Sequence, residues 1–409
     1  MLTLLRYFTV VLFSVVVPEW LITLLQLGET PSPLLLKISM AIAFLFASAS
    51  FISVRLVSRF PGDRSLVSIA PIVVAWYSLS LIFVFFTSLP YSVVYLGLSF
   101  LLCMLLVYLD YQYFEKNKPL NLAYYPIGRA DIVESIPGAN WIRMDTPALP
   151  AQRIDGVVTD LHAPALTDEW QKFLAQCTLK HVPVYNIRQI QESLTGRVKI
   201  RHMYENDLGS LLPSETYSVL KRIWETALVL LSMPIVLPIM IITGIVIKLE
   251  SDGPMLFLQK RVGQFGKEFT IFKFRSMCRD SEKDGAQFAQ AGDMRVTRVG
   301  KFIRKTRIDE LPQFFNIIRG EMALIGPRPE QKVFVDQFEE QIPFYNYRHI
   351  VKPGISGWAQ TVHGYAADAD ETQVKIEHDF YYIKNFSFWL DFLIVFKTIK
   401  TMLTGFGAR

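Results

Sequence analysis

Two adjacent carboxylates, Asp309 and Glu310, lie in residues 306–320, whose sequence TRIDELPQFFNIIRG is typical of a helix with defined ends. Asp309 can act as an N-cap and Glu310 favours the first turn. Pro312 is tolerated early in a helix, and Gly320 can end it. This capping pattern alone explains both carboxylates without any chemistry. It leaves the basic residues on either side unexplained.

Cations surround the carboxylate pair in the sequence. Arg304, Lys305 and Arg307 lie immediately upstream, and Arg328 follows in the sequence GPRP at residues 326–329. The two prolines hold Arg328 in an extended backbone, which suits a guanidinium that clamps phosphate. One carboxylate can attack phosphorus or hold Mg²⁺, while cations and helix N–H groups neutralise the transferred phosphate. The pattern predicts phosphoryl transfer.

A second basic feature lies in residues 269–277, FTIFKFRSM, which alternate as a β-strand does. The alternation puts Lys273 and Arg275 on one face of the strand, where two cations can form an anion site. A solvated strand face explains the same fragment equally well.

Other chemistries find little support in the sequence. It contains no P-loop, kinase, HExxH or GxSxG motif, and the six histidines have no paired metal-ligand spacing. The three cysteines are scattered, which argues against a zinc ribbon or a disulfide framework. A net charge of +5 fits anionic lipid or phosphate ligands. It is too mild to predict a nucleic-acid partner.

The composition indicates which elements position these groups. Of 409 residues, 51% are hydrophobic and only 19% charged, whereas soluble proteins have about a quarter charged. Four hydrophobic stretches come first, each near the ~20 residues that a membrane-crossing helix needs. They cover residues 2–27, 34–57, 66–89 and 91–109. We therefore expect a four-helix transmembrane bundle in residues 1–111.

The basic residues between these stretches indicate the orientation of the bundle. Arg6 precedes the first span, and the first and third connections have almost no cations. The second connection and the segment after the fourth span carry Arg55, Arg59, Arg64, Lys116 and Lys118. By the positive-inside rule, both ends of the bundle face the cytoplasm.

Residues 112–205 have the composition of a soluble domain. Short apolar runs at 141–144, 156–159 and 182–187 are predicted strands, and residues 166–179 have helical spacing. Strand, helix and strand in this order predict a small cytoplasmic Rossmann-like α/β domain with parallel pairing. The G-x-G-x-x-G turn of a dinucleotide site is missing from it.

A fifth hydrophobic segment, residues 223–247, lies within the last predicted domain, residues 206–409. Basic residues flank both of its ends, and Pro234 and Pro238 interrupt it. Proline removes a backbone donor and bends a helix, so we expect a broken, re-entrant helix that enters and leaves the same leaflet. A kinked helix that spans the membrane is the alternative.

A final apolar segment, residues 386–403, mixes aromatic residues with Asp391, Lys397 and Lys400. This mixture suits an interfacial helix near lipid headgroups. A core helix of the last domain is nearly as good an explanation.

Seven motifs in the last domain closely resemble, in order, those of the bacterial sugar transferases. These enzymes are polyprenyl-phosphate hexose-1-phosphate transferases, also called monotopic-type phosphoglycosyl transferases. The motifs are KR at 221–222, SDGP at 251–254, QKRVG at 259–263, KFRSM at 273–277, DELPQ at 309–313, GPRP at 326–329 and KPGISGWAQ at 352–360. Four preceding spans and a small α/β domain resemble the long form of the family.

The resemblance implies a fold in three parts. These are an α-helical membrane bundle, an α/β cytoplasmic domain, and a mixed α/β phosphoglycosyl transferase domain with a re-entrant membrane helix broken at Pro234 and Pro238. Many members carry Ser-Pro at the break, whereas this chain has Leu237-Pro238. We therefore expect that a serine hydrogen bond to the freed backbone is lost.

The resemblance also implies a two-step reaction. Asp309 would attack the β-phosphate of a UDP-sugar, release UMP, and pass the phosphosugar to undecaprenyl phosphate. Glu310 would assist, and both carboxylates would hold Mg²⁺. The cations that match the family's phosphate-binding positions are Lys273, Arg275, Arg304 and Arg328. The product would initiate exopolysaccharide, O-antigen or capsule synthesis at the bacterial inner membrane.

The identity of the sugar stays open at this point. UDP-glucose or UDP-galactose is the first expectation, with an N-acetylhexosamine behind them. A homo-oligomer formed through the four spans is also compatible with the sequence.

Two other functions explain less of the sequence. A transporter would use the four spans alone, but these contain few ionisable residues and no evident repeat. A catalytically silent membrane scaffold or regulator of polysaccharide assembly would tolerate an altered dyad or GPRP motif, and both are intact.

Overall fold

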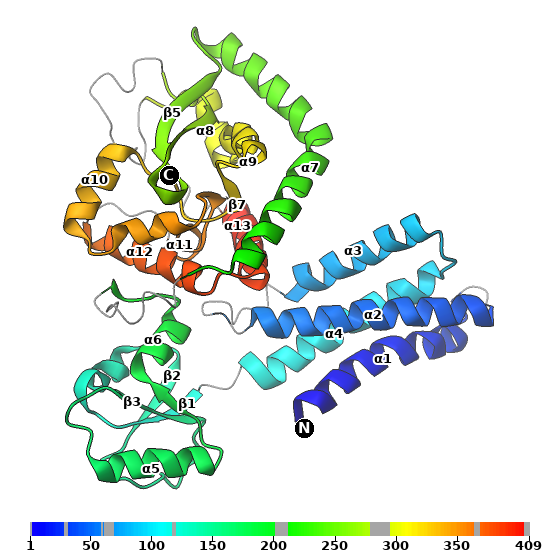
Figure 1. Ribbon diagram of the computed structural model, residues 1–409. Coiled ribbons are helices and arrows are strands. Elements are labelled where there is room, and N and C mark those ends of the chain that lie inside the picture. The colour runs from blue at the N-terminus through cyan, green and yellow to red at the C-terminus, as the bar shows by residue number, and fades with distance from the viewer. Residues whose placement is uncertain are drawn as a thin grey trace. The chain divides into compact units, whose positions relative to one another are not determined.

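The computed structural model of the chain describes residues 2–27, 32–58, 60, 69–116, 120–200, 212–278, 295–363 and 369–404 (Figure 1). The chain divides into two compact units, Met1–Gly196 and Arg197–Arg409. The predicted domain boundary at residues 205 and 206 lies outside the described residues. In the second unit, Arg197 Nε donates to Glu377 Oε2 at 3.0 Å, and Val198 N donates to the Glu377 carbonyl.

Four apolar helices begin the first unit: α1 (Leu2–Leu25), α2 (Pro33–Val57), α3 (Ile69–Thr87) and α4 (Val93–Tyr111). Each is long and apolar enough to cross a membrane, which confirms the four predicted helices within the described residues. Small polar side chains lie between the helices; Ser14, Ser50 and Ser99 are fully buried. Small residues let helices approach closely where lipid removes the usual hydrophobic driving force.

An ion pair joins the first and last helices of this bundle. Arg6 near the start of α1 forms a bidentate pair with Asp110 near the end of α4, with both N–O distances 2.7 Å. The Arg6 guanidinium also lies 4.3 Å from the centre of the Phe114 ring. The chain therefore enters and leaves the bundle at the same end, as the positive-inside pattern predicted. Three cations of that pattern, Arg59, Arg64 and Lys118, lie outside the described residues.

The first unit also contains a parallel four-stranded sheet of order β2-β1-β3-β4. Its strands are β1 (Leu120–Tyr124), β2 (Ala139–Arg143), β3 (Gly156–Thr159) and β4 (Val184–Asn186), and its helices include α5 (Asp168–Leu179) and α6 (Ile187–Thr195). Leu122 and Val158 pack toward Ile190 of α6, whereas Val157 packs toward Trp170 of α5. This confirms the predicted α/β domain; strand β1 was not anticipated.

Helix α7 (Glu215–Glu250) is the longest element of the second unit, with 36 residues. A straight helix of this length would measure about 54 Å, well beyond a hydrocarbon core of about 30 Å. Pro234 and Pro238 lie inside it, and Figure 1 shows that the helix changes direction part-way along. The predicted break is thus a bend in one assigned helix rather than a gap between two.

A serine hydroxyl supports the backbone near this bend. Ser232 Oγ donates to the Val229 carbonyl at 2.7 Å, just before Pro234. Pro234 and Pro238 remove the N–H partners of the Leu230 and Pro234 carbonyls, so this bond to Val229 is not one to a freed group. The expected loss of a serine hydrogen bond to the freed backbone stays a prediction.

The two faces of α7 have different surroundings. Val229 packs with Ile271 and Ile317, and Met240 packs with Phe274 and Ile303. The opposite face is open, with Leu231 76% and Ile235 71% exposed. One side of α7 therefore belongs to the protein core, while the other is an apolar surface suited to lipid.

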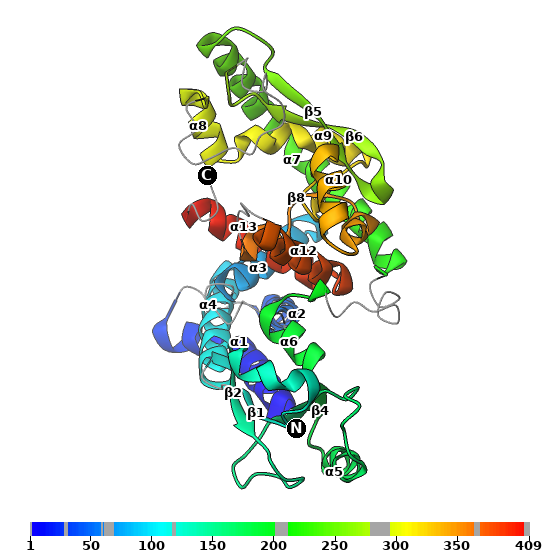
Figure 2. The same ribbon diagram turned by 90° about the vertical axis from the view of Figure 1, so that its left-hand side faces the viewer.

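The rest of the second unit is mixed α/β, as predicted. Strands β5 (Leu256–Val262) and β6 (Glu268–Phe274) form an antiparallel hairpin, and β7 (Ala323–Ile325) pairs in parallel with β8 (Gly354–Ser356). Figure 2 shows α9 beside the hairpin. The helices after the hairpin are α8 (Arg298–Lys305), α9 (Phe314–Arg319), α10 (Lys332–Gln341), α11 (Trp358–Val362), α12 (Ala369–Lys384) and α13 (Phe388–Thr404).

Helix α13 resolves the alternatives for the last apolar segment. Leu390, Leu393 and Ile394 are fully buried, and so is Asp391. Asp391 accepts hydrogen bonds from Tyr382 at 2.8 Å and Tyr217 at 2.5 Å. Helix α13 is therefore a core helix, and the interfacial alternative is not needed.

Candidate active site

The two carboxylates lie in a short 3-10 turn, η7 (Ile308–Gln313), between α8 and α9. Arg307 precedes the turn with a left-handed backbone (φ 59°), which lets the chain reverse sharply. Asp309 is therefore not the N-cap of a regular helix, and that part of the sequence prediction is wrong. Gly320 does end α9, in the left-handed conformation at φ 80°.

Asn316 of α9 fixes this turn against strand β6. Its Oδ1 accepts a hydrogen bond from Phe272 N at 3.1 Å, and its Nδ2 donates to the Thr270 carbonyl at 2.8 Å. Asn316 is fully buried, so both bonds are shielded from water. The sequence analysis missed this residue, although a lone amide within the apolar run FFNII was a signal. Through these bonds the turn lies beside Lys273.

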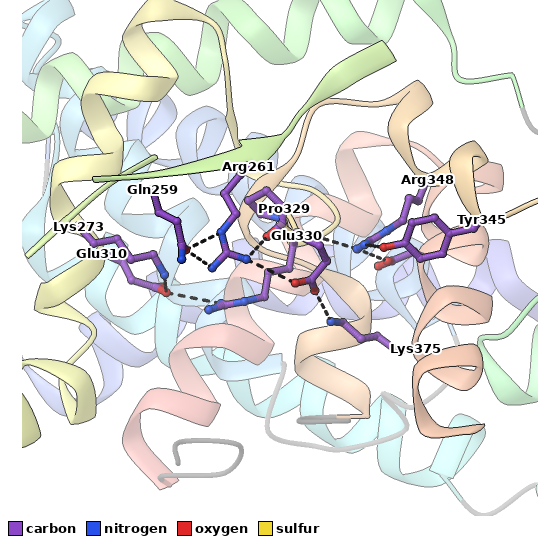
Figure 3. Close-up of polar contacts among 11 residues, drawn as sticks. Gln259, Arg261, Lys273, Glu310, Pro329, Glu330, Tyr345, Arg348 and Lys375 are labelled. Atoms are coloured by element: carbon purple, nitrogen blue, oxygen red, sulfur yellow. Dashed lines mark hydrogen bonds and ion pairs between the residues drawn. The ribbon is translucent and has the colours of Figure 1, made fainter. Parts of the chain in front are cut away.

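Glu310 receives three positive charges on one oxygen, and Figure 3 shows Lys273 beside it. Its Oε1 lies 3.1 Å from Lys273 Nζ, 3.5 Å from Arg328 Nη1 and 3.9 Å from Arg307 Nη1. Burial by itself raises the pKa of Glu310. The charges of Lys273, Arg328 and Arg307 outweigh that effect and lower the pKa to about 2. Glu310 is therefore an anion that holds these cations in place.

Asp309 has the opposite electrostatic character. Its Oδ1 is buried and has no hydrogen-bond partner among the described residues. Burial and the charge of Glu310 raise the pKa of Asp309 to about 6, although Lys273 and Arg307 oppose them. An unsatisfied buried carboxylate oxygen is uncommon and marks a group available for a ligand or a reaction.

These carboxylates are compatible with Mg²⁺. Mg²⁺ is usually bound by one or two carboxylates together with substrate phosphates and water. The free Oδ1 of Asp309 suits this mode, whereas Glu310 Oε1 is already held by cations. Within the described ranges no cluster of three or more metal-ligating side chains occurs.

The loop that carries Arg328 is fastened by its backbone. Gly326 N donates to the Ser356 carbonyl at 2.8 Å, and Gly354 N donates to the Pro327 carbonyl at 2.9 Å. The loop thus continues the pairing of β7 with β8. Because its backbone is fixed on both sides of Pro327, the Arg328 side chain leaves from a defined point.

Arg348 holds the same loop from behind. Its Nη2 donates to the Arg328 carbonyl at 2.8 Å and lies 2.9 Å from Asp379 Oδ2, while its Nη1 donates to Tyr345 Oη at 2.9 Å (Figure 3). Only 3% of Arg348 is exposed. Its place in the sequence gave no signal of this role.

Glu330 anchors the other end of the loop. Its carboxylate lies 2.8 Å from Lys375 Nζ and 3.5 Å from Arg261 Nη1, and Arg261 Nη1 also donates to the Pro329 carbonyl at 3.1 Å. Burial raises the pKa of Glu330, but the charges of Lys375, Arg348 and Arg261 lower it to about 2. The GPRP segment is therefore held by a charged network as well as by strand pairing.

The four cations predicted to bind phosphate occupy different places. Lys273 and Arg328 lie on Glu310, and the charge of Arg304, on α8, acts on Asp309. Arg275 instead donates to the carbonyls of Ser251 and Asp252 at 2.8 and 2.6 Å. It caps the end of α7, so the structure does not bring it to the carboxylates.

Comparison with known proteins shows which family the chain resembles. Residues 216–405 match the model of the bacterial sugar transferase family. The chain is 56% identical over 351 residues to a UDP-N-acetylgalactosamine-undecaprenyl-phosphate N-acetylgalactosaminephosphotransferase of Aeromonas hydrophila, which covers 86% of this chain and 83% of the relative. It is 40% identical over 203 residues to a UDP-glucose:undecaprenyl-phosphate glucose-1-phosphate transferase of Caulobacter vibrioides, a match that covers 49% of this chain and 76% of the relative. It is 35% identical over 229 residues to an enzyme of the same name from Klebsiella pneumoniae, a match that covers 54% of this chain and 48% of the relative.

Proposed function

Because this chain belongs to the bacterial sugar transferase family, we propose that it transfers a sugar 1-phosphate from a UDP-sugar to undecaprenyl phosphate and releases UMP. The names of its relatives support these two substrates. One structural observation carries the proposal. Asp309, whose Oδ1 has no hydrogen-bond partner among the described residues, lies beside a second carboxylate, Glu310, that holds three cations. The product would begin an exopolysaccharide, O-antigen or capsule repeat unit.

In the first step, the Asp309 carboxylate attacks the β-phosphorus of the UDP-sugar. An O–P bond forms to Asp309, and the bond from the β-phosphorus to the bridging oxygen breaks, so UMP leaves with that oxygen. The product is an aspartyl phosphosugar. Arg328 and Lys273, held by Glu310, neutralise charge that develops on the phosphoryl oxygens.

In the second step, an oxygen of undecaprenyl phosphate attacks the phosphorus on Asp309. The aspartyl O–P bond breaks and the Asp309 carboxylate is restored. The sugar phosphate is now joined to the lipid phosphate as undecaprenyl diphosphate-sugar. Because the same carboxylate attacks in the first step and leaves in the second, donor and acceptor can use one site in turn.

Magnesium fits this scheme through Asp309, with Glu310 as a second carboxylate close by. When bound, Mg²⁺ would neutralise negative charge on the diphosphate of the UDP-sugar. Glu310 then keeps Lys273 and Arg328 in position, and Arg304 adds positive charge beside Asp309.

The membrane arrangement follows from where the substrates are. UDP-sugars are cytoplasmic, so we place the catalytic unit on the cytoplasmic side of the bacterial inner membrane. Helices α1–α4 return the chain to the side where it began, as the Arg6–Asp110 pair supports. A re-entrant α7 keeps Asp309 on that side, with the apolar face around Leu231 and Ile235 in the lipid.

We propose N-acetylgalactosamine as the sugar, ahead of glucose and galactose. The similarity to the N-acetylgalactosamine enzyme extends over 86% of this chain. The glucose enzymes of Caulobacter and Klebsiella cover about half of it, at lower identity.

The test is a panel of UDP-sugars with the purified full-length protein, Mg²⁺ and undecaprenyl phosphate, scored by UMP release. We expect UMP release with UDP-N-acetylgalactosamine and formation of the matching lipid product. An otherwise identical Asp309→Asn protein is the control. If the folded protein releases no UMP from any UDP-sugar on the panel, the proposed function is wrong.

A further inference from the structure

A small cavity with a basic lining lies in the catalytic unit, where the start of α7 meets β7 and the segment before β8. It has a volume of about 60 Å³, and its lining includes Ser218, Lys221, Arg222, Glu225 and Lys352. The residues that surround Asp309 and Glu310 do not line it. A cavity needs about 10–15 Å³ of this volume to hold one water, so there is room for a phosphate group.

The three cations of this cavity are not equally neutralised. Lys221 lies 2.7 Å from Glu225 and also contacts Asp391. The side chains of Arg222 and Lys352 have neither a hydrogen bond nor a carboxylate within ion-pair distance among the described residues. The cavity therefore contains two cations that make no direct ion pair with a carboxylate in the described part of the chain.

The charge on Lys352 is disfavoured by this environment. Burial lowers the pKa of Lys352, and the positive charge of Arg222 lowers it further, with only Glu225 acting in the other direction. A bound anion would relieve both effects, because it would neutralise two like charges at once.

The Arg222 guanidinium also lies against the backbone of Gly320. A Cβ atom added to Gly320 would lie only 1.9 Å from Arg222 Nη1, so the guanidinium rests against the Gly320 backbone at the end of α9. Gly320 has φ +80°, a conformation that favours glycine. The glycine thus serves both the helix end and the close approach of Arg222.

The cavity lies at the point where α7 becomes apolar. Ile223 follows Arg222 directly and is 62% exposed, and Leu220 is also exposed. Basic residues beside an exposed apolar surface are typical of the headgroup level of a membrane. Phosphate is the anion that a bilayer offers at that level.

We propose that this cavity binds the phosphate group of a membrane lipid, with Arg222 and Lys352 as its cationic ligands. The proposal rests on the membrane placement of α7 in the proposed function, but it does not depend on the covalent chemistry at Asp309. The lipid is either a phospholipid or the polyprenyl phosphate acceptor, since both present the same group.

Native mass spectrometry of the full-length protein in detergent tests the proposal. The protein is titrated separately with phosphatidylglycerol, undecaprenyl phosphate and inorganic phosphate. We expect a lipid to bind, and Arg222→Gln and Lys352→Gln each to weaken that binding about tenfold, as removal of one charged hydrogen bond does. Lys332→Gln is the matched control, because Lys332 is exposed on α10 and does not line the cavity.

The lipid whose binding weakens identifies the occupant, and either lipid supports the proposal. It is overturned if the variants bind both lipids as the wild type does, or if only inorganic phosphate binds. If Arg222→Gln does not fold, lipid binding by Lys352→Gln is sufficient to test the proposal. Transfer of β-³²P from the UDP-sugar to Asp309, measured without acceptor, should persist in both variants. Its failure in the wild type would refute the proposed chemistry and leave the lipid result standing.

Discussion

The Lys273 ammonium lies 3.1 Å from Glu310 Oε1, while Asp309 Oδ1, one residue away, has no hydrogen-bond partner in the described chain. The two neighbouring carboxylates therefore have different electrostatic surroundings. Glu310 has a lowered pKa and is neutralised by cations, whereas Asp309 has a raised pKa and a free oxygen. This division suits one carboxylate that organises the site and another that reacts.

Asp309→Asn should abolish UMP release and the transfer of ³²P from β-labelled UDP-sugar to the protein. An amide cannot form the acyl phosphate, so the loss should exceed 10³-fold. Stability should change little, because Asp309 Oδ1 makes no hydrogen bond within the described residues. Asp336→Asn, on the exposed surface of α10, is the matched control. Normal turnover by Asp309→Asn would exclude this residue as the nucleophile.

The rate of the first step should depend on pH through Asp309. Its carboxylate must be ionised to attack, so UMP release without acceptor should rise as the pH passes about 6 and then level off. Glu310→Gln removes a negative charge that raises the pKa of Asp309. The pH at which the rate of UMP release rises should therefore move to a lower value, while the plateau rate at higher pH falls severely. Single-turnover rates between pH 4.5 and 8 check both effects, and a rise at an unchanged pH would contradict the proposed coupling.

Replacing Arg328 should mainly slow the reaction, whereas replacing Arg275 should mainly destabilise the fold. Arg328→Met removes a cation from Glu310 and should slow UMP release about 10²- to 10³-fold with little unfolding. Arg275→Met removes buried hydrogen bonds to the end of α7 and should lower the free energy of unfolding by about 3 kcal/mol. Thermal unfolding and single-turnover rates per folded molecule separate the two. The reverse pattern would show that Arg275 is the phosphate ligand.

Arg348 should act as a positioning residue for Arg328. Arg348→Lys can keep a charge beside Asp379 but cannot also reach the Arg328 carbonyl and Tyr345, so the rate should fall about 10- to 100-fold. Tyr345→Phe removes only one hydrogen bond and should cost less than tenfold. Rates measured with thermal unfolding midpoints distinguish misplacement from unfolding. If folded Arg348→Lys releases UMP as fast as the wild type, Arg348 does not position Arg328.

The re-entrant path of α7 can be tested by labelling single cysteines. Ser218→Cys and Glu268→Cys lie on either side of the apolar part of α7, and both positions are exposed. In a background without Cys103, Cys177 and Cys278, both should react only with reagent that reaches the cytoplasm. Labelling of position 268 from outside intact cells, with 218 protected, would mean that α7 crosses the membrane.

The sequence by itself determined the elements whose causes are local. Hydrophobic length predicted α1–α4, a short apolar run predicted β3, and the alternation of apolar residues predicted β6. Proline at two positions predicted the bend of α7, and Gly320 predicted the end of α9. Motif spacing also predicted the carboxylate pair of the candidate site. Each of these depends on residues within one or two turns of one another, so the sequence contains the necessary information.

Only the tertiary structure decided which charges meet. Lys273 and Arg275 are two residues apart on a predicted strand face, yet β6 ends at Phe274, and the Arg275 guanidinium turns to the end of α7. Asn316 brings η7 to Lys273, and Arg348 reaches back to the backbone of Arg328. Contacts between distant segments follow from how buried polar groups find partners in the folded core. That pairing depends on the whole packing arrangement, and no local pattern specifies it.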